Sequence, residues 1–325
     1  MRLLAQLLLL APAAIWAAPC TTVAGCTEYV TLAGGPSRSL VYRTHPLEVR
    51  NPQITRALVM IHGAGRDADN YFRTALAAAF LAGALEDTIV ISPRFASNSN
   101  GCADVLAPNE VSWSCNGDSW RSGGTSTSDE RLTAYDFTDE ILRKLAKKDV
   151  FANLKTIVVA GHSAGGQFVN RYEMSNQVHD TPGVAITYVV SNPSSYAYLD
   201  AARPVQEGIA TCKNYDNWPY GLQGRTGGYT VKEKETDEQL KKQLAARPVT
   251  YLLGEIDILP LGGFDSSCSA MTQGPTRLAR GQAFGKYVNE KYSARHTTTI
   301  VPLCGHNARC MFTSELALPI LFPKP

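Results

Sequence analysis

The sequence predicts an α/β fold, in which a mostly parallel, twisted sheet carries helices on both faces. Short apolar runs rich in Val and Ile recur along the chain, and such continuous runs are typical of strands buried on both faces. Helical patterns separate these runs, as the connections of a parallel sheet require. With 325 residues, of which 44% are hydrophobic, the chain has enough apolar material for one large core.

Each predicted element follows from its residues, taken in chain order. Two β-rich segments separated by Ala-Gly-Gly-Pro indicate an antiparallel hairpin at the sheet edge, and an alanine-rich stretch indicates the first helix. Thr127 with Glu130, and Thr236 with Gln239, have the spacing of a capping box and are expected to begin helices. The predicted strands are residues 28–32, 39–44, 56–61, 88–92, 157–160, 184–190, 249–253 and 297–301, and the predicted helices are residues 68–85, 127–148, 232–242 and 276–292.

Residues 1–18 have the pattern of a signal peptide. One positive charge at Arg2 precedes an apolar core, and small residues follow, so that cleavage after Ala17 or Ala18 is expected. No other stretch reaches the roughly 18 apolar residues that span a bilayer. We therefore expect a soluble protein, secreted or periplasmic, whose residues 19–325 form a single domain.

Composition limits the partners and cofactors. A net charge of +2 without basic blocks argues against nucleic acid and against an anionic membrane as partners. The eight cysteines are an even number in an exported chain, which indicates disulfides. A metal site is the competing interpretation, but the sequence has neither a C-x-x-C pair nor clustered histidines, and no metal is expected. Closeness in sequence, with elimination for the third pair, predicts Cys20–Cys26, Cys102–Cys115, Cys212–Cys268 and Cys304–Cys310.

Two irregular stretches, residues 93–127 and 192–235, leave the carboxyl ends of predicted strands, where open α/β sheets bind ligands. The first contains Trp113 and Trp120, and the second contains Trp218. We interpret both as walls of an open, aromatic-rimmed substrate pocket. The second is too polar and too short for a large helical lid, and its competing interpretation is aromatic packing under a loop. The competing interpretation for the first is a surface excursion whose tryptophans pack on their own disulfide.

Asn192 and Tyr196 follow the predicted strand at residues 184–190. Topology makes both candidate substrate-binding residues, although turn chemistry explains the Asn-Pro pair equally well.

The pentapeptide Gly161-His-Ser163-Ala-Gly165 lies between a buried strand and a helix. A serine at such a turn projects its hydroxyl beyond the sheet, while the free N–H groups of the helix start face any developing negative charge. This is the G-x-S-x-G nucleophile elbow in its required context, and the competing interpretation is a glycine-rich turn that merely contains serine. The chain here resembles the α/β-hydrolase superfamily, in particular its secreted esterases and lipases.

The resemblance implies an oxyanion hole built from backbone N–H groups. One donor follows the nucleophile, which gives Ala164, and the other lies in the H-G-x segment after the strand at residues 56–61, which gives Ala64. Gly65 is the second choice for this donor and a candidate substrate contact. His62 is expected to shape the loop rather than to act as a base.

The resemblance also implies a triad acid after the penultimate strand and a histidine after the last strand. Asp257 fits the Gly-x-x-Asp pattern, with Glu255 and Asp265 as alternatives, and His306 follows the final strand in a glycine-preceded loop. The order Ser163, Asp257, His306 is that of the superfamily.

These residues predict a serine hydrolase that cleaves a small-molecule or polymeric carboxylic ester through an acyl-enzyme, without a cofactor. An amidase, peptidase or acyltransferase would use the same residues. From a different class, the chain could be a catalytically silent binding module that has kept the fold.

Overall fold

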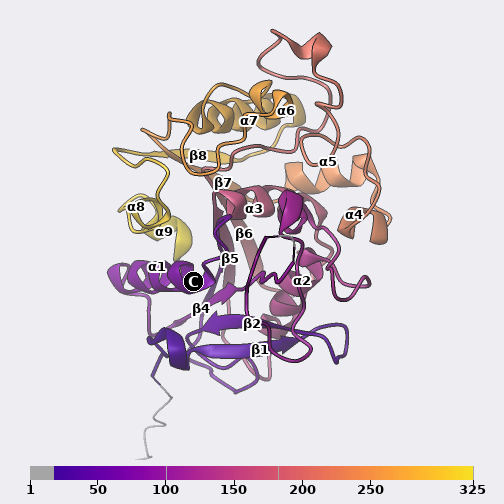
Figure 1. Ribbon diagram of the computed structural model, residues 1–325. Coiled ribbons are helices and arrows are strands. Elements are labelled where there is room, and N and C mark those ends of the chain that lie inside the picture. The colour runs from indigo at the N-terminus through magenta and orange to yellow at the C-terminus, as the bar shows by residue number, and fades with distance from the viewer. Residues whose placement is uncertain (1–17, 100, 182, 325) are drawn as a thin grey trace, which may run out of the picture.

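The computed structural model describes residues 18–99, 101–181 and 183–324. The predicted signal peptide therefore lies outside the described residues except for Ala18. One eight-stranded sheet has the order β1-β2-β4-β3-β5-β6-β7-β8 (Figure 1). Its strands are β1 Thr27–Thr31, β2 Arg38–Arg43, β3 Arg56–Ile61, β4 Thr88–Pro93, β5 Thr156–His162, β6 Ala185–Ser191, β7 Val249–Gly254 and β8 Thr297–Val301.

The sheet is mostly parallel, as predicted. Strands β1 and β2 pair antiparallel at one edge, and β2 pairs antiparallel with β4. Every further pair, from β4–β3 across to β7–β8, is parallel. The carboxyl ends of β3, β5, β7 and β8 therefore lie at the same edge of the sheet, which brings distant loops together.

The first and last predicted helices, residues 68–85 and 276–292, match α1 and α7 closely, whereas the helix predicted at residues 232–242 begins five residues later as α5. The α-helices are α1 Ala68–Leu81, α2 Ala134–Leu145, α3 Ala164–Ser175, α4 Tyr229–Lys232, α5 Asp237–Ala246, α6 Cys268–Met271, α7 Arg277–Tyr292, α8 Ala308–Phe312 and α9 Leu318–Leu321. Short 3₁₀ turns are η1 Val23–Gly25, η2 Asn116–Ser122 and η3 Ile209–Thr211. The capping box of Thr236 and Gln239 begins α5 as predicted.

The predicted start of the second helix at Thr127 is wrong. Helix α2 begins seven residues later, and its capping box joins Thr133 to Asp136. The Thr127 hydroxyl instead donates a hydrogen bond to the Ser112 carbonyl, 3.0 Å away. Thr127 thus belongs to the irregular stretch, and the helix is capped by Thr133, whose hydroxyl accepts from the Asp136 N–H.

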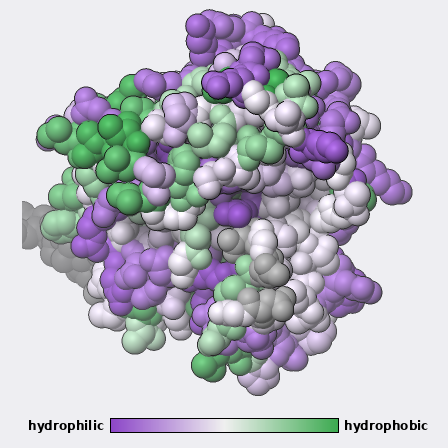
Figure 2. All heavy atoms as spheres, turned by 45° about the horizontal axis from the view of Figure 1, so that its top comes forward, coloured by the Kyte–Doolittle hydropathy of each residue, from purple (hydrophilic) through white to green (hydrophobic). Residues whose placement is uncertain are grey.

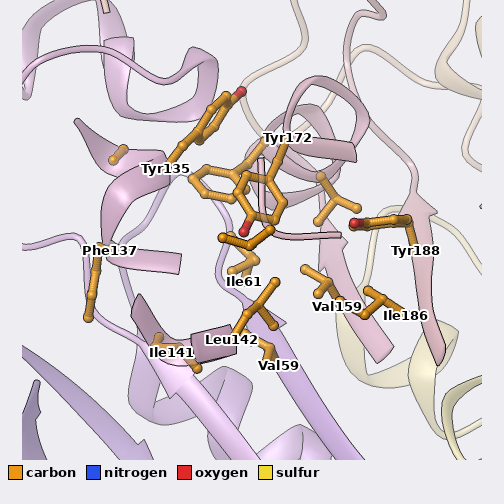
Figure 3. Packing of buried hydrophobic residues seen from close by; sticks show 14 of the residues in the cluster. Val59, Ile61, Tyr135, Phe137, Ile141, Leu142, Val159, Tyr172, Ile186 and Tyr188 are labelled. Atoms are coloured by element: carbon orange, nitrogen blue, oxygen red, sulfur yellow. The ribbon is translucent and has the colours of Figure 1, made fainter. Parts of the chain in front are cut away.

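Helices cover both faces of the sheet (Figure 1). The alternation of side chains along β3 separates two cores: Val59 and Ile61 join the cluster under α2, α3, α5 and α7, whereas Leu58 and Met60 join the cluster under α1, α8 and α9. Figure 3 shows part of the first cluster, with Leu142 of α2 beside Val59.

The first irregular stretch packs into this core. Trp120 stacks on Phe95 with ring centroids 5.0 Å apart, and Trp113 lies parallel to Phe137 of α2 at 6.5 Å. Both tryptophan side chains are almost wholly buried. The stretch therefore extends the core rather than walling a substrate pocket, because burial of a tryptophan removes a large apolar surface from water.

The second irregular stretch also packs inward. Tyr196 stacks on Phe284 of α7 with ring centroids 4.6 Å apart and has no exposed surface. Trp218 is half-buried and donates its indole N–H to the Ser122 carbonyl at 3.1 Å, so that it joins the two stretches.

The structure contains four disulfides, Cys20–Cys26, Cys102–Cys115, Cys212–Cys268 and Cys304–Cys310. They are the four expected pairs, three from closeness in sequence and Cys212–Cys268 by elimination. Within the described part of the chain, no helix is long and apolar enough to cross a membrane.

Candidate active site

Ser163 lies at an abrupt turn between β5 and α3. Its backbone has φ 59° and ψ −120°, a left-handed conformation that a residue with a side chain rarely adopts. The turn is possible because neighbouring glycines leave room: a Cβ on Gly165 would lie 2.3 Å from the Ile61 carbonyl oxygen, and one on Gly166 would lie 2.4 Å from that of Ser191. Gly165 and Gly166 therefore let the elbow approach β3 and β6.

Three side chains from separate loops meet at this turn. His306 Nε2 lies 3.0 Å from Ser163 Oγ, and His306 Nδ1 lies 2.8 Å from Asp257 Oδ2. Both distances are within the range in which a base can take a proton and be oriented by a carboxylate. The Asp257 side chain is nearly inaccessible to water, whereas that of His306 is partly exposed.

The other two candidate acids do not contact His306. Glu255 is exposed and accepts a hydrogen bond from the Leu303 N–H at 2.9 Å. Asp265 accepts one from the Tyr220 hydroxyl at 2.8 Å. Among the three carboxylates, the structure brings Asp257 to the imidazole.

Sequence reasoning missed a buried arginine beside the acid. Arg277 Nη1 lies 3.6 Å from Asp257 Oδ1, the oxygen that does not face His306. The same guanidinium donates to Ser194 Oγ at 2.8 Å and to the Gly262 carbonyl at 2.9 Å. Burial lowers the pKa of Arg277, against the opposing pull of Asp257. Nothing in the sequence marks this arginine, because it is simply the first residue of a capped helix.

Asn192 occupies a supporting position rather than a substrate-binding one. Its buried Oδ1 accepts from the Gly254 N–H at 2.8 Å, and its Nδ2 donates to the Gly305 carbonyl at 3.4 Å. It thus ties together the loops that carry Asp257 and His306. Turn chemistry was the alternative interpretation of this residue, and the contacts favour a structural role.

The loop after β3 is held by a neutral histidine. His62 Nδ1 lies 2.8 Å from the Gly63 carbonyl, to which it donates, and Nε2 accepts from the Phe95 N–H at 3.1 Å. Burial lowers the pKa of His62 to about 4, so that the ring stays neutral near pH 7. Ala64, which follows Gly63, donates no backbone hydrogen bond within the described residues.

The N–H of Ala164, at the start of α3, likewise has no acceptor among the described residues. His162 supports the base: its ring lies 4.6 Å from that of His306 between centroids, and Tyr71 Oη approaches its Nδ1 at 3.3 Å. Burial lowers the pKa of His162 well below its usual range, so that no second positive charge competes with His306.

A cavity of about 720 Å³ lies directly over Ser163 and His306. Its walls come from residues 63–74, from Gly262 and Gly263, and from residues 306–309. None of the described residues in 93–127 and 192–235 lines this cavity, which differs from the expectation that both insertions wall the pocket.

Of the six candidate substrate contacts, Gly65 alone lines this cavity. Trp113, Trp120 and Tyr196 are buried in the core, and Asn192 and Trp218 make the structural bonds described above. These aromatic side chains pack into the core because their large apolar surface is more stable when it is removed from water.

The cavity instead contains polar residues that sequence reasoning did not select. Asp67 and Asn70 come from the start of α1, and Asn307 and Arg309 follow the histidine. These side chains resemble ordinary helix-start and loop residues in the sequence. They surround Ser163 only because the loops that carry them leave the same edge of the sheet.

Comparison with known proteins identifies the family and the fold. Residues 58–315 match the model of the Alpha/beta hydrolase family. Poly(aspartic acid) hydrolase-1 from Sphingomonas sp. KT-1 is similar in structure, with a TM-score of 0.64, 23% identity, and coverage of 91% of this chain and 98% of that chain. LpqC, a poly(3-hydroxybutyrate) depolymerase from Bordetella parapertussis, has a TM-score of 0.60 and 20% identity over 92% of this chain and 95% of that one. No curated protein sequence matches the chain.

Proposed function

Because the chain belongs to the alpha/beta hydrolase family, we propose that it is a serine hydrolase that cleaves carboxylic esters through an acyl-enzyme. One observation carries the proposal: Ser163, His306 and Asp257 form a hydrogen-bonded series, at 3.0 and 2.8 Å, on the floor of an accessible cavity. A hydroxyl, an imidazole and a carboxylate in this order constitute the machinery of acyl transfer.

In the proposed mechanism, His306 Nε2 takes the proton of Ser163 Oγ as that oxygen attacks the ester carbonyl. Asp257 accepts from Nδ1–H, which holds the ring in the required tautomer and stabilises the imidazolium. The N–H groups of Ala64 and Ala164 stabilise the oxyanion, and one such donor contributes about 3 kcal/mol to lowering the barrier. The imidazolium then protonates the leaving alcohol.

Water completes the cycle. His306 takes a proton from a water molecule that attacks the acyl-enzyme, a second oxyanion forms in the same hole, and Ser163 leaves with the proton returned by the imidazolium. This chain needs no group beyond its own residues for either half-reaction.

An ester is favoured over an amide by analogy with LpqC, a poly(3-hydroxybutyrate) depolymerase. Poly(aspartic acid) hydrolase-1 is named for a polyamide, so that the ester preference rests on LpqC and not on both relatives. The same residues would serve an amidase, peptidase or acyltransferase. A p-nitrophenyl ester and the matching p-nitroanilide distinguish an esterase from an amidase or peptidase. We expect kcat/KM to be higher for the ester, by more than the difference in intrinsic reactivity between the two compounds.

The proposal includes export. Residues 1–18 act as a cleaved signal peptide, and residues 19–325 form the mature domain in the periplasm or outside the cell. Four disulfides support an oxidising compartment. Mass spectrometry of protein expressed with its own N-terminus tests the cleavage site directly.

The decisive experiment replaces the nucleophile. Ser163→Ala should lower kcat on p-nitrophenyl butyrate by about 10⁴-fold or more while the circular dichroism spectrum stays unchanged. A fluorophosphonate probe should label the wild-type protein and not the variant. Full activity in the variant would contradict the proposal, and a wild-type protein that neither turns over esters nor takes up the probe would support a silent binding module.

A further inference from the structure

Exposed aliphatic side chains gather beside the candidate active site. Five of the thirteen large hydrophobic side chains that are exposed among the described residues belong to the two short loops that carry Asp257 and His306. They range from 50% to 80% exposed and are named here the aliphatic rim: Ile256, Ile258, Leu259, Leu261 and Leu303. Figure 2 shows hydrophobic side chains concentrated at the upper left of one face, the side on which the loops after β7 and β8 lie in Figure 1.

The rim is continuous with the cavity mouth. The Ile256 N–H donates to the Cys304 carbonyl at 3.1 Å, which joins the two loops side by side. Gly262 and Gly263, which directly follow Leu261, line the cavity, and a Cβ on Gly262 would lie 3.2 Å from the His306 ring. A surface that touches the rim is therefore presented to Ser163.

The rim loops are anchored, so that their exposure is a property of the fold. Arg277 bonds the Gly262 carbonyl, and Arg280 Nη1 donates to the Asp265 carbonyl at 2.9 Å. Both guanidinium groups also lie over the Phe264 ring, at 5.2 and 4.3 Å from its centroid. The Cys304–Cys310 disulfide closes the other loop.

Leu303 is exposed at a cost to the protein. It is 80% exposed and has φ 57°, in the left-handed region that leucine rarely adopts. Such a residue contributes neither to the core nor to a relaxed turn. Backbone strain combined with an outward apolar side chain is typical of a binding position.

The composition of the rim identifies the surface that it fits. Residues 255–263 and 302–306 contain no Lys, Arg, Trp or Tyr, the residues that dock proteins to lipid headgroups and membrane interfaces. Their exposed acid, Glu255, accepts a hydrogen bond from the Leu303 N–H. A second copy of the chain seated on the rim would cover the cavity mouth. An uncharged, aliphatic solid needs no basic or aromatic side chains for its contact with the rim. It also lies next to the ester-cleaving cavity and presents its own chains to the cavity mouth.

We propose that the aliphatic rim docks this hydrolase onto the surface of an insoluble aliphatic polyester, so that a surface chain segment enters the cavity. The inference rests on the proposed ester hydrolysis. The cavity-wall residues Ala64, Gly65 and Asn307 are exposed, so that the mouth is open to solvent, as a polymer segment longer than one ester unit requires.

The test compares the triple variant Leu259→Ser, Leu261→Ser, Leu303→Ser with a control that removes equally exposed apolar groups elsewhere, Val49→Ser, Phe80→Ser, Val105→Ser. On soluble p-nitrophenyl butyrate both variants should keep kcat/KM within about twofold of the wild type, because neither set lines the cavity. On polycaprolactone particles the rim variant should show at least about tenfold weaker adsorption and slower product release, and the control should show neither.

Adsorption is also measured with Ser163→Ala, so that docking is scored without turnover. If p-nitrophenyl butyrate is not cleaved but the Ser163→Ala protein still adsorbs through the rim, the hydrolytic proposal fails and the docking proposal stands. Leu303→Ser alone serves as a second variant whose melting temperature should match that of the wild type.

Three outcomes overturn the docking proposal. One is unchanged adsorption of the folded rim variant. Another is a wild-type dimer by sedimentation that the rim substitutions dissociate, since the rim would then be a subunit interface. The third is rim-dependent binding to phosphatidylcholine vesicles without adsorption to polyester.

Discussion

Gly165→Ala tests whether the elbow and the oxyanion loop depend on one close approach. An added Cβ would lie 2.3 Å from the Ile61 carbonyl oxygen and 2.6 Å from that of His62. Both obstacles are backbone atoms, which cannot rotate away, so that relief needs a shift of about 1 Å between α3 and the end of β3. Overpacking of this kind costs typically about 1–3 kcal/mol of folding free energy.

The shift acts on the segment that leads directly to Ala64. A misplacement of about 1 Å in a catalytic group can lower the rate about 100-fold. We therefore expect kcat on p-nitrophenyl butyrate to fall by about that factor with little change in KM, because the oxyanion forms only in the transition state. The melting temperature should fall by about 5 °C.

Gly227→Ala is the matched control. No atom lies within 4 Å of a Cβ built at that glycine, and its backbone is outside the left-handed region. Both its kcat and its melting temperature should equal those of the wild type. If Gly165→Ala kept kcat within about threefold of the control, the reasoning that links this contact to the oxyanion loop would be refuted.

Variants at three further places probe other contacts. Arg277→Met should leave the Asp257 carboxylate buried without its countercharge, which costs about 3–5 kcal/mol of stability by denaturant unfolding and lowers kcat, with partial recovery in Arg277→Lys. Cys304→Ser with Cys310→Ser opens a loop of sequence separation 6, which should cost about 2 kcal/mol and lower kcat more than it alters KM, because the His306 loop is no longer held. Burial raises the pKa of Glu235 from its ordinary 4.5 to about 8. Between these two pH values the folded protein retains a proton that the unfolded chain has lost, so that the free energy of unfolding falls as the pH rises from 4.5 to about 8. Glu235→Gln should therefore raise the melting temperature at pH 9 relative to the wild type and leave it nearly unchanged at pH 5.

Each of these three has a distinct contrary result. Equal kcat in Arg277→Met and the wild type would remove Arg277 from the support of the acid. A cysteine double variant that matches the wild type in both melting temperature and kcat would mean that the disulfide does not hold the loop. A Glu235→Gln effect that is equal at pH 5 and pH 9 would show that this carboxyl is not protonated in the folded state.

Local sequence patterns predicted several elements of the fold and of the candidate site. The continuous apolar runs predicted the central strands because a strand buried on both faces needs no polar side. The glycine spacing around Ser163 predicted the elbow because a Cβ there would collide with backbone. The positions of Asp257 and His306 at strand ends were informative because parallel strands end at a common edge of the sheet.

The fold class, the order of the strands along the chain and the serine at the elbow were determined by the sequence, since each depends on neighbours a few positions away. The family resemblance implied Asp257 and His306, and the tertiary structure decided for Asp257 against Glu255 and Asp265. The burial of Trp113 and Tyr196, the ion pair of Arg277 with Asp257, and the outward aliphatic rim were decided only by the tertiary structure. A tryptophan in an irregular segment fits a pocket wall or a core equally well by composition. Which of these it forms depends on the space left between elements far apart in the chain, and that space exists only once the sheet and its helices have packed.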